Sequence, residues 1–467
     1  MPQNEPLDVA AFASAYQQLA EAVGRAAPTQ PAPFALLLRD HLGMDTTTLA
    51  VVAMPVQVFD HPNLQRALDA LGSEDDVDVL RVVGMRGQHR HYGAVSLATL
   101  TQSDLRLEVG PVDHVERPID TNRTLACIDF GLLLLRVGSI PFALLVRGAD
   151  ERMGSSTLTV EVMGPARDAG GELLGRLRAL MAEHNVFRGK IVSLVPAGGM
   201  GGMSGSLVAR FVERPSLERP DVILPGGTLE RIERITVDFS ARAASLRAGG
   251  RHLRRGLLLH GPPGTGKTHT VRYLLSRLSD RTVFVLSGQG LGVISSTVAL
   301  ARKLQPSIVV LEDVDLVAEE RTRPHAGTNP VLFELLNQMD GVEEDADIVF
   351  ILTTNRPDLL EPALASRPGR VDLAVEVPLP AAPERGRLLE LYSAGLRVEG
   401  VEWAPIVERT DGCSAAFLRE LLRQAALEGA STDNEPPLID QATLLTVLAD
   451  LTNASHSMTL RLLGSSG

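Results

Sequence analysis

Apolar runs alternate with amphipathic segments from about residue 221 to residue 380. The runs are apolar at successive positions, which is typical of strands in a parallel sheet covered by helices on both faces. The candidate strands are residues 256–260, 282–286, 308–311, 348–353 and 373–377. Helical periodicity follows the first of them over residues 270–278. This alternation predicts βαβ units, and therefore an α/β domain.

The first part of the chain has a different pattern. An amphipathic helix is expected around Val9 to Val23, followed by short segments of β-type alternation at residues 48–59, 105–109 and 158–162. A second helix, residues 172–183, leads into a predicted strand at residues 190–195. We interpret residues 1–215 as an α+β domain, and we find no catalytic motif in it.

Only helical periodicity is evident after Pro380, at residues 384–395, 415–428 and 440–451. Proline-containing segments between Arg214 and Pro225 indicate the end of the first domain. The predicted organisation is therefore an α+β domain (1–215), an α/β domain (216–380) and a small helical domain (381–467).

Composition and charge narrow the classes of function. The chain of 467 residues is 44% hydrophobic and 22% charged, with a net charge of −12. A negative charge, 4% aromatic content and the lack of a basic run with interleaved aromatics argue against a nucleic-acid partner. The most apolar region, residues 130–146, is interrupted by Arg136, Gly138 and Pro141, so we expect two core strands there and no membrane segment.

The two cysteines, Cys127 and Cys413, have no metal-ligand or redox spacing. Residues 1–9 are polar and acidic, unlike a signal peptide. These features favour a reducing, cytoplasmic location.

The most informative motif follows the first candidate strand and fits the pattern G-x-x-x-x-G-K-[ST]. It consists of Gly261, Pro262, Pro263, Gly264, Thr265, Gly266, Lys267 and Thr268, and we include the next residue, His269, in the predicted nucleotide-binding stretch. Glycines let such a loop turn its N–H groups toward a phosphate at a helix start. Lys267 is expected to contact the β- and γ-phosphates, and the Thr268 hydroxyl to bind Mg²⁺. The chain has only three lysines among its 45 Lys and Arg residues, and Lys267 is one of them.

A second set of candidate residues lies at the end of the third candidate strand. Residues 308–315 read Ile-Val-Val-Leu-Glu-Asp-Val-Asp. One of the adjacent carboxylates, Glu312 and Asp313, can hold Mg²⁺ through its water shell, and the other can orient or deprotonate the attacking water. Both are expected where ligands of parallel sheets bind, at the carboxyl ends of the strands.

Three further candidate residues follow along the chain. Asn355, after the next candidate strand, is predicted to position the water near the γ-phosphate. Arg367 and Arg370, held by Pro368 and Gly369, suit phosphate recognition because a guanidinium group makes bidentate contacts. Because the chain is rich in arginine, the alternative is that Arg367 and Arg370 are surface residues without a role in phosphate recognition.

The order of these motifs resembles the AAA branch of the AAA+ ATPases over roughly residues 220–440, about half of the chain. It includes the P-loop, the acidic strand end, Leu-Asn-Gln-Met-Asp-Gly (336–341), Thr-Thr-Asn-Arg-Pro (353–357) and Arg-Pro-Gly-Arg (367–370). Bacterial relatives of the mitochondrial AAA ATPase that translocates the Rieske protein look most similar. The N-terminal part falls outside the resemblance.

The resemblance implies a P-loop NTPase sheet of strand order 5-1-4-3-2, a helical lid and a ring, usually hexameric. It also implies ATP and Mg²⁺ as cofactors. By similarity, Gly261–Thr268 is Walker A, Glu312 and Asp313 are Walker B, and Asn355 is sensor 1. Arg367 and Arg370 would be arginine fingers reaching the nucleotide of a neighbouring subunit. Such a finger can contribute on the order of 10³–10⁵ in turnover.

Three departures from the family pattern bear on mechanism. The carboxylates occur as Glu312-Asp313, whereas the family usually has Asp-Glu, so the shorter Asp313 requires a closer water and hydrolysis can be slow. Ser366 adds one residue before Arg367, which alters the spacing to the expected finger. The segment 287–294, Ser-Gly-Gln-Gly-Leu-Gly-Val-Ile, lacks the aromatic residue that protein-threading rings usually carry, so we expect weak grip on an extended polypeptide.

The sequence therefore predicts an ATP-hydrolysing ring protein that remodels a protein or protein complex. The N-terminal domain would recognise a client or an adaptor. The sequence contains no His-Glu-x-x-His motif, so we do not expect a self-contained protease. The alternative is a nucleotide-dependent assembly switch with slow turnover, and a DNA-directed AAA+ ATPase is disfavoured by the net charge.

Overall fold

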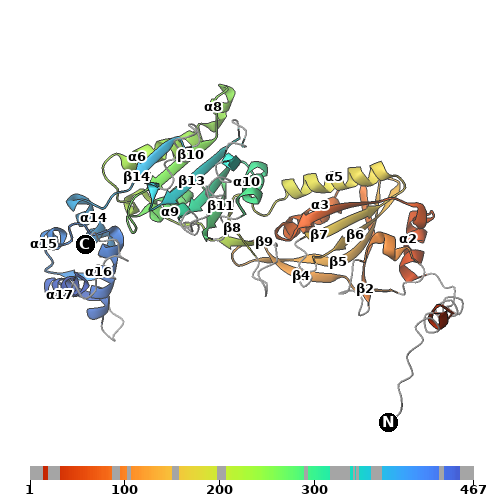
Figure 1. Cartoon of the computed structure of the whole chain (residues 1–467), viewed down its shortest axis with the longest axis horizontal. Coiled ribbons are helices and arrows are strands. Elements are labelled where there is room, and N and C mark those ends of the chain that lie inside the picture. The colour runs from red at the N-terminus through yellow and green to blue at the C-terminus, as the bar shows by residue number, and fades with distance from the viewer. Residues whose placement is uncertain are drawn as a thin grey trace, which may run out of the picture.

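The computed structural model describes residues 14–18, 32–86, 95–102, 107–149, 157–196, 207–288, 293–315, 337–339, 342, 346–358, 371–430 and 436–452. Three units follow one another in Figure 1, with an N-terminal α+β unit, a second sheet flanked by helices, and a C-terminal helical unit. No helix among these residues is long and apolar enough to cross a membrane.

The N-terminal unit is built on an antiparallel sheet of order β1-β7-β6-β5-β2-β3, with β4 paired to β5. Its strands are β1 (Val51–Gln57), β2 (Val77–Arg86), β3 (Glu108–Gly110), β4 (Asp113–Pro118), β5 (Thr124–Val137), β6 (Ile140–Arg147) and β7 (Thr157–Met163). Its helices are α2 (Pro33–Leu42), α3 (His61–Leu71), α4 (Leu97–Leu100) and α5 (Arg167–Glu183), with short 3₁₀ turns at η1 (Thr46–Thr48) and η2 (Val58–Asp60).

Alternation along the strands gives this sheet two apolar faces. On β5, Ile128 and Leu133 lie in the core under α3 and α5, while Phe130 and Leu132 lie in the core under α2 and α4. The apolar region 130–146 forms parts of β5 and β6, as the sequence predicted. The predicted helix at Val9 to Val23 falls mostly outside the described residues.

The second sheet has the order β14-β10-β13-β12-β11-β8-β9. Its strands are β8 (Ile191–Pro196), β9 (Leu207–Val212), β10 (Arg255–His260), β11 (Thr282–Ser287), β12 (Ser307–Glu312), β13 (Ile348–Thr354) and β14 (Leu373–Glu376). Its helical segments are η5 (Arg219–Asp221), α6 (Thr228–Glu233), the π-helical η6 (Arg234–Asp238), α7 (Phe239–Ala241), α8 (Ala243–Ala248), α9 (Lys267–Arg277) and α10 (Ile294–Lys303). All five predicted strands are present, with ends within one residue of those expected.

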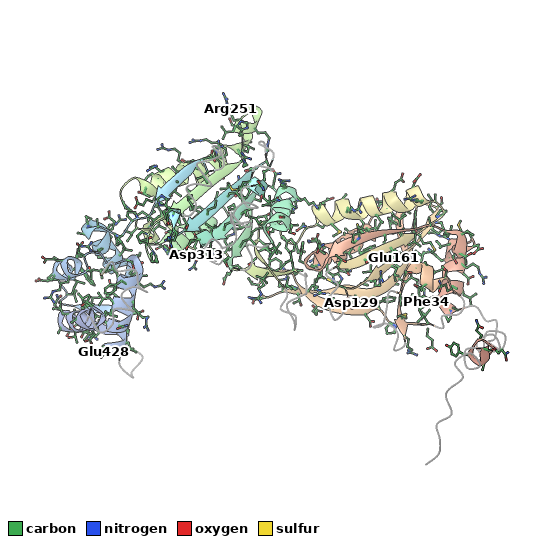
Figure 2. The ribbon with its side chains drawn as sticks, viewed as in Figure 1. Phe34, Asp129, Glu161, Arg251, Asp313 and Glu428 are labelled. Atoms are coloured by element: carbon green, nitrogen blue, oxygen red, sulfur yellow. The ribbon has the colours of Figure 1, made fainter. Side chains whose placement is uncertain are left out.

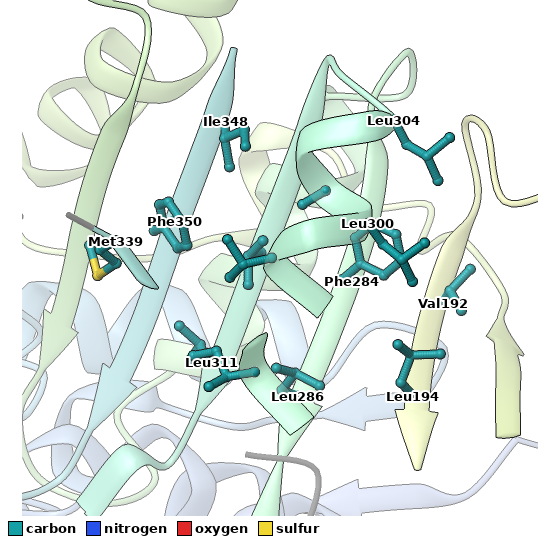
Figure 3. Packing of buried hydrophobic residues seen from close by; sticks show 14 of the residues in the cluster. Val192, Leu194, Phe284, Leu286, Leu300, Leu304, Leu311, Met339, Ile348 and Phe350 are labelled. Carbon is teal, nitrogen blue, oxygen red and sulfur yellow. The ribbon is translucent and has the colours of Figure 1, made fainter. Parts of the chain in front are cut away.

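Helices cover both faces of this sheet, which explains the uninterrupted apolar runs. One core contains Leu300 of α10 and Leu304 at its C-cap, together with Phe284 and Phe350 (Figure 3). The other contains α9 and α6 residues packed on Leu257, Leu259 and Ile351. Strand β8 and strands β10 to β14 pair in parallel, so their carboxyl ends lie at one edge.

Two strands from before residue 216 extend this sheet. β8 pairs in parallel with β11 through Ile191 and Val192, and β9 pairs antiparallel with β8. The sequence indicated the strand at residues 190–195 but grouped it with the N-terminal domain. Its partner lies about ninety residues further along the chain, and periodicity alone does not identify a partner at that distance.

The C-terminal unit contains α14 (Ala382–Tyr392), α15 (Trp403–Arg409), α16 (Ala415–Glu428) and α17 (Gln441–Thr452). A core that includes Leu389, Ile406, Phe417 and Leu448 holds the helices together. The expectation of helices alone was wrong in one detail. Two short parallel strands, β15 (Arg397–Glu399) and β16 (Leu438–Asp440), lie between the helices, and three-residue strands are too short to show a period in the sequence.

The first helix turn of α3 places a histidine in the N-terminal core. His61 is 1% exposed, and its Nε2–H donates to the Ile128 carbonyl over 2.9 Å. Its Nδ1 is buried with no hydrogen-bond partner among the described residues. Burial lowers the pKa of His61 to about 4, the bond to Ile128 opposes this, and the nearby Arg117 adds to the lowering.

This burial predicts a pH-dependent loss of stability. In the unfolded chain His61 takes up a proton near pH 6.5, while in the folded chain it does so only near pH 4. The contribution of the buried, neutral His61 to the stability of the fold is therefore complete at neutral pH. It is lost as the pH falls from about 6.5 toward 4. At pH 5 this difference in proton binding lowers the free energy of unfolding by about 2 kcal/mol.

We expect His61→Gln, which keeps an N–H donor, to reduce the drop in denaturation midpoint of the full chain between pH 7 and pH 5. The exposed His184 supplies the matched control, His184→Gln. If the denaturation midpoint of the His61→Gln variant fell as much between pH 7 and pH 5 as that of the wild type, this account would be contradicted.

Candidate functional site

The candidate site begins where β10 ends. The chain leaves His260 through Gly261, whose φ is +143°, and a Cβ there would lie 2.3 Å from the Val377 carbonyl oxygen. Gly266 has a φ of +107° and is the N-cap of α9. The predicted order of strand, glycine-rich loop and helix is therefore present, and the turns need the backbone freedom of glycine.

The Lys267 side chain lies inside this loop. Lys267 is 6% exposed, and its Nζ donates to the Gly261 carbonyl over 2.9 Å and to the Pro262 carbonyl over 2.7 Å. Burial lowers its pKa, while Asp313 and Asp315 oppose that change. The ammonium group therefore lies within electrostatic range of both carboxylates.

The neighbouring residues of the loop have different surroundings. The Thr265 hydroxyl donates to the Pro262 carbonyl over 2.9 Å, which tightens the turn. Thr268 is exposed on the first turn of α9. His269 was included in the predicted nucleotide-binding stretch. Its Nε2–H donates to the Asp221 carbonyl over 2.9 Å, which ties the segment before α6 to the start of α9.

The predicted carboxylates lie at the end of β12. Glu312 is the last residue of the strand, and Asp313 follows with a φ of +49°, the one positive value outside glycine among the described residues. This left-handed conformation is uncommon, but Asp tolerates it better than most residues. The Asp313 N–H donates to the Thr353 hydroxyl over 3.0 Å, which joins the ends of β12 and β13.

Both carboxyl groups have raised pKa values. Burial is the main cause for Glu312, Asp313 adds to it, and Arg272 opposes it. Burial is also the main cause for Asp313, Asp315 adds to it, and Lys267 opposes it. Asp313 thus lies within electrostatic range of Lys267. Figure 2 labels Asp313 at the edge of the second sheet.

Asn355 follows directly on β13, with its backbone N–H donating to the buried Asp315 over 3.1 Å. The end of β13 is thus joined to the segment after β12 by both Thr353 and Asn355. Arg367 and Arg370 lie outside the described residues, as do residues 289–292 of the glycine-rich segment after β11 and residues 336, 340 and 341.

The helical unit contributes contacts that the sequence did not predict. The Ala416 N–H donates to the Gly264 carbonyl over 3.0 Å, and a Cβ on Gly264 would lie 2.8 Å from Ser414 Oγ. Ser414 caps α16 by accepting a hydrogen bond from the Phe417 N–H. A Ser three residues before an apolar helical position is a recognisable start signal, but it does not show which loop the helix end contacts.

Two residues of the site were missed in the sequence. Asp315 was visible two positions after Asp313, and Thr353 was read as part of a strand and of the motif at residues 353–357, but neither was given a role. Both residues were missed for the same reason: their contacts join the end of β12 to the end of β13, and a sequence pattern does not show contacts between strands.

Comparison with known proteins shows a family similarity over the part of the chain that contains this site. Residues 257–379 match the model of the ATPase family associated with various cellular activities (AAA). The matched stretch contains the loop, the carboxylates and Asn355, so the chain contains an AAA domain.

Several curated proteins are similar to part of the chain. The ATP-dependent zinc metalloprotease FtsH of Mycoplasmopsis synoviae is 30% identical over 323 residues, covering 62% of this chain and 47% of the relative. The 26S proteasome regulatory subunit 10B of Dictyostelium discoideum is 36% identical over 186 residues, covering 37% and 47%. The proteasome-activating nucleotidase of Thermococcus onnurineus is 32% identical over 185 residues, covering 37% and 46%. The chain thus spans about half the length of these relatives.

The Lys267 ammonium group is expected to dominate affinity for phosphate. We predict that Lys267→Ala weakens binding of a fluorescent ATP analogue in the presence of Mg²⁺ by roughly 10- to 100-fold, because a charge-assisted hydrogen bond is lost. Fluorescence titration measures the dissociation constant directly.

Lys303→Ala is the matched control, because it removes the same charge from the exposed end of α10, which leads into the opposite end of β12. Equal affinity of the Lys267 variant and the wild type would place the nucleotide elsewhere.

Proposed function

Taking residues 257–379 as an AAA domain, we propose that this chain binds and hydrolyses Mg²⁺-ATP at the carboxyl ends of β10 and β12. The observation that carries the proposal is the near-buried Lys267 ammonium group in a glycine loop, within electrostatic range of Asp313 and Asp315. A cation for phosphate and a carboxylate for water are then available at the same edge of the sheet.

The proposed roles follow from position. The N–H groups of the loop and Lys267 would hold the β- and γ-phosphates, with Gly261, Gly264 and Gly266 giving the backbone its turns. Asp313 would orient the attacking water and accept its proton. The Asn355 side chain, at the tip of β13, would hold the same water from the other side.

The donor set also fits a magnesium ion. Thr268 is exposed on the first turn of α9 and Glu312 ends β12, so a hydroxyl and a carboxylate oxygen are available, the ligand types that Mg²⁺ prefers. No cluster of three His, Cys, Asp or Glu ligands occurs among the described residues, which suits an ion held by few protein ligands. When bound, Mg²⁺ would neutralise charge on the phosphate oxygens.

A ring of copies, a hexamer by family resemblance, is part of the proposal because Arg367 and Arg370 would complete the site of a neighbour. Asp372, two residues after Arg370, accepts the Gly256 N–H over 2.8 Å at the start of β10. The P-loop begins five residues later, about 16 Å along the strand. The anchoring of Asp372 far from its own P-loop favours a finger that reaches another copy.

We further propose that the ring acts on proteins, with the N-terminal unit recognising a client or an adaptor and the helical domain (381–467) serving as the lid. The contact between Ala416 and Gly264 supports the second assignment, because it links the helical unit to the phosphate loop. The names of two relatives associate them with the proteasome, and a third is named as a protease.

A reducing, cytoplasmic setting fits the two buried free cysteines.

The test is the steady-state Mg²⁺-ATPase rate per subunit across a dilution series. We expect specific activity to rise with protein concentration as copies assemble. Arg367→Ala or Arg370→Ala should lower turnover by roughly 10³-fold or more while nucleotide still binds. Asp313→Asn should bind ATP and turn it over at least about 100-fold more slowly, since the water loses its base.

A rate that is independent of concentration and insensitive to both arginines would contradict the ring proposal. Assembly that requires ATP, with turnover that no protein client accelerates, would favour the nucleotide-dependent switch.

A further inference from the structure

One buried carboxylate of the site has no part in the proposed chemistry. Asp315 is 4% exposed and lies two residues after Asp313. A charged side chain is rarely buried to this extent unless it is paired or hydrogen-bonded. Its surroundings therefore indicate what it does.

Asp315 Oδ1 accepts two hydrogen bonds from the tip of β13. The Thr354 hydroxyl donates over 2.8 Å, and the Asn355 N–H donates over 3.1 Å. The Thr354 oxygen in turn accepts the Arg356 N–H over 2.9 Å. The whole turn that carries Asn355 is thus fixed by hydrogen bonds that lead back to one carboxylate.

The same carboxylate interacts with the phosphate loop and with the proposed base. Its charge counteracts the lowering of the Lys267 pKa, and it raises the pKa of Asp313. Asp315 therefore lies within electrostatic range of both groups while it holds the third element, the tip of β13, by direct contact.

We propose that Asp315 is a positioning residue that fixes the Asn355 turn relative to Asp313 and Lys267, and so sets the place of the attacking water. The inference rests on the proposed ATPase function. An ionised carboxylate suits the task because its hydrogen bonds are shorter and stronger than those of a neutral acceptor. Asp315 itself need not touch ATP, since it acts through Asn355.

Asp315→Asn tests the proposal with little change in volume. The amide retains one acceptor oxygen, but the charge is lost and an N–H₂ group is added. We expect kcat to fall roughly 10- to 100-fold, because a displaced catalytic group costs turnover steeply. The dissociation constant for Mg²⁺-ATP should not rise, since the change removes a negative charge from the neighbourhood of the phosphates.

A double-mutant cycle with Asn355→Ala shows whether Asp315 acts through Asn355. If it does, Asp315→Asn should have little further effect on kcat in the Asn355→Ala background. Asp358→Asn is the matched control, because it removes a carboxylate charge from the same tip at an exposed position, where Asp358 pairs with Arg356. Its kcat should equal that of the wild type.

A pair of substitutions on the other side of the hydrogen bond keeps the test valid if Asp315→Asn fails to fold. Thr354→Val removes the donor at constant shape and should lower kcat without weakening ATP binding. Thr354→Ser restores the hydroxyl and should recover the rate.

The outcomes separate this inference from the function on which it rests. A wild-type chain that turns over ATP, with Asp313→Asn inactive but Asp315→Asn and Thr354→Val at full rate, would overturn only the role of Asp315. The role of Asp315 would also be overturned if Asp315→Asn lowered kcat by the same factor in the wild-type background and in the Asn355→Ala background. A wild-type chain that binds Mg²⁺-ATP without turnover would overturn the proposed function, and the positioning role with it.

Discussion

The near-buried ammonium group of Lys267 is the interaction on which the candidate site depends. A cation so little exposed needs compensation, and here two carbonyls of its own loop and the nearby charges of Asp313 and Asp315 supply it. The loop can provide those carbonyls only because Gly261 and Gly266 adopt positive φ. A phosphate group would offer the same ammonium a stronger partner.

The parallel sheet brings the other groups to this lysine. The loop after β10 and the carboxylates after β12 lie at the same edge, and β13 runs between the two strands. Hydrogen bonds from Asp313 to Thr353, and from Thr354 and Asn355 to Asp315, then join neighbouring strand ends. The site is thus a product of strand order, and its accuracy depends on side chains that bridge the strands.

Local sequence was sufficient for the strands and for the loop, because each is defined by neighbouring residues. Apolar runs placed β10 to β14 within one residue, and the glycine pattern identified the turn at Gly261. Contacts between distant segments were not predictable in the same way. The pairing of β8 with β11, the bond from Ala416 to Gly264, and the contact of Asp315 with Thr354 each join residues that periodicity treats separately.

A structure of the chain with bound Mg²⁺ and a slowly hydrolysed ATP analogue is the most direct test of the central claim. The account predicts that Lys267 Nζ leaves the carbonyls of Gly261 and Pro262 for the β- and γ-phosphates. Asp313 and Asn355 should then flank the γ-phosphate. A nucleotide located away from this edge of the sheet, or Lys267 still bonded to both carbonyls beside a bound nucleotide, would contradict it.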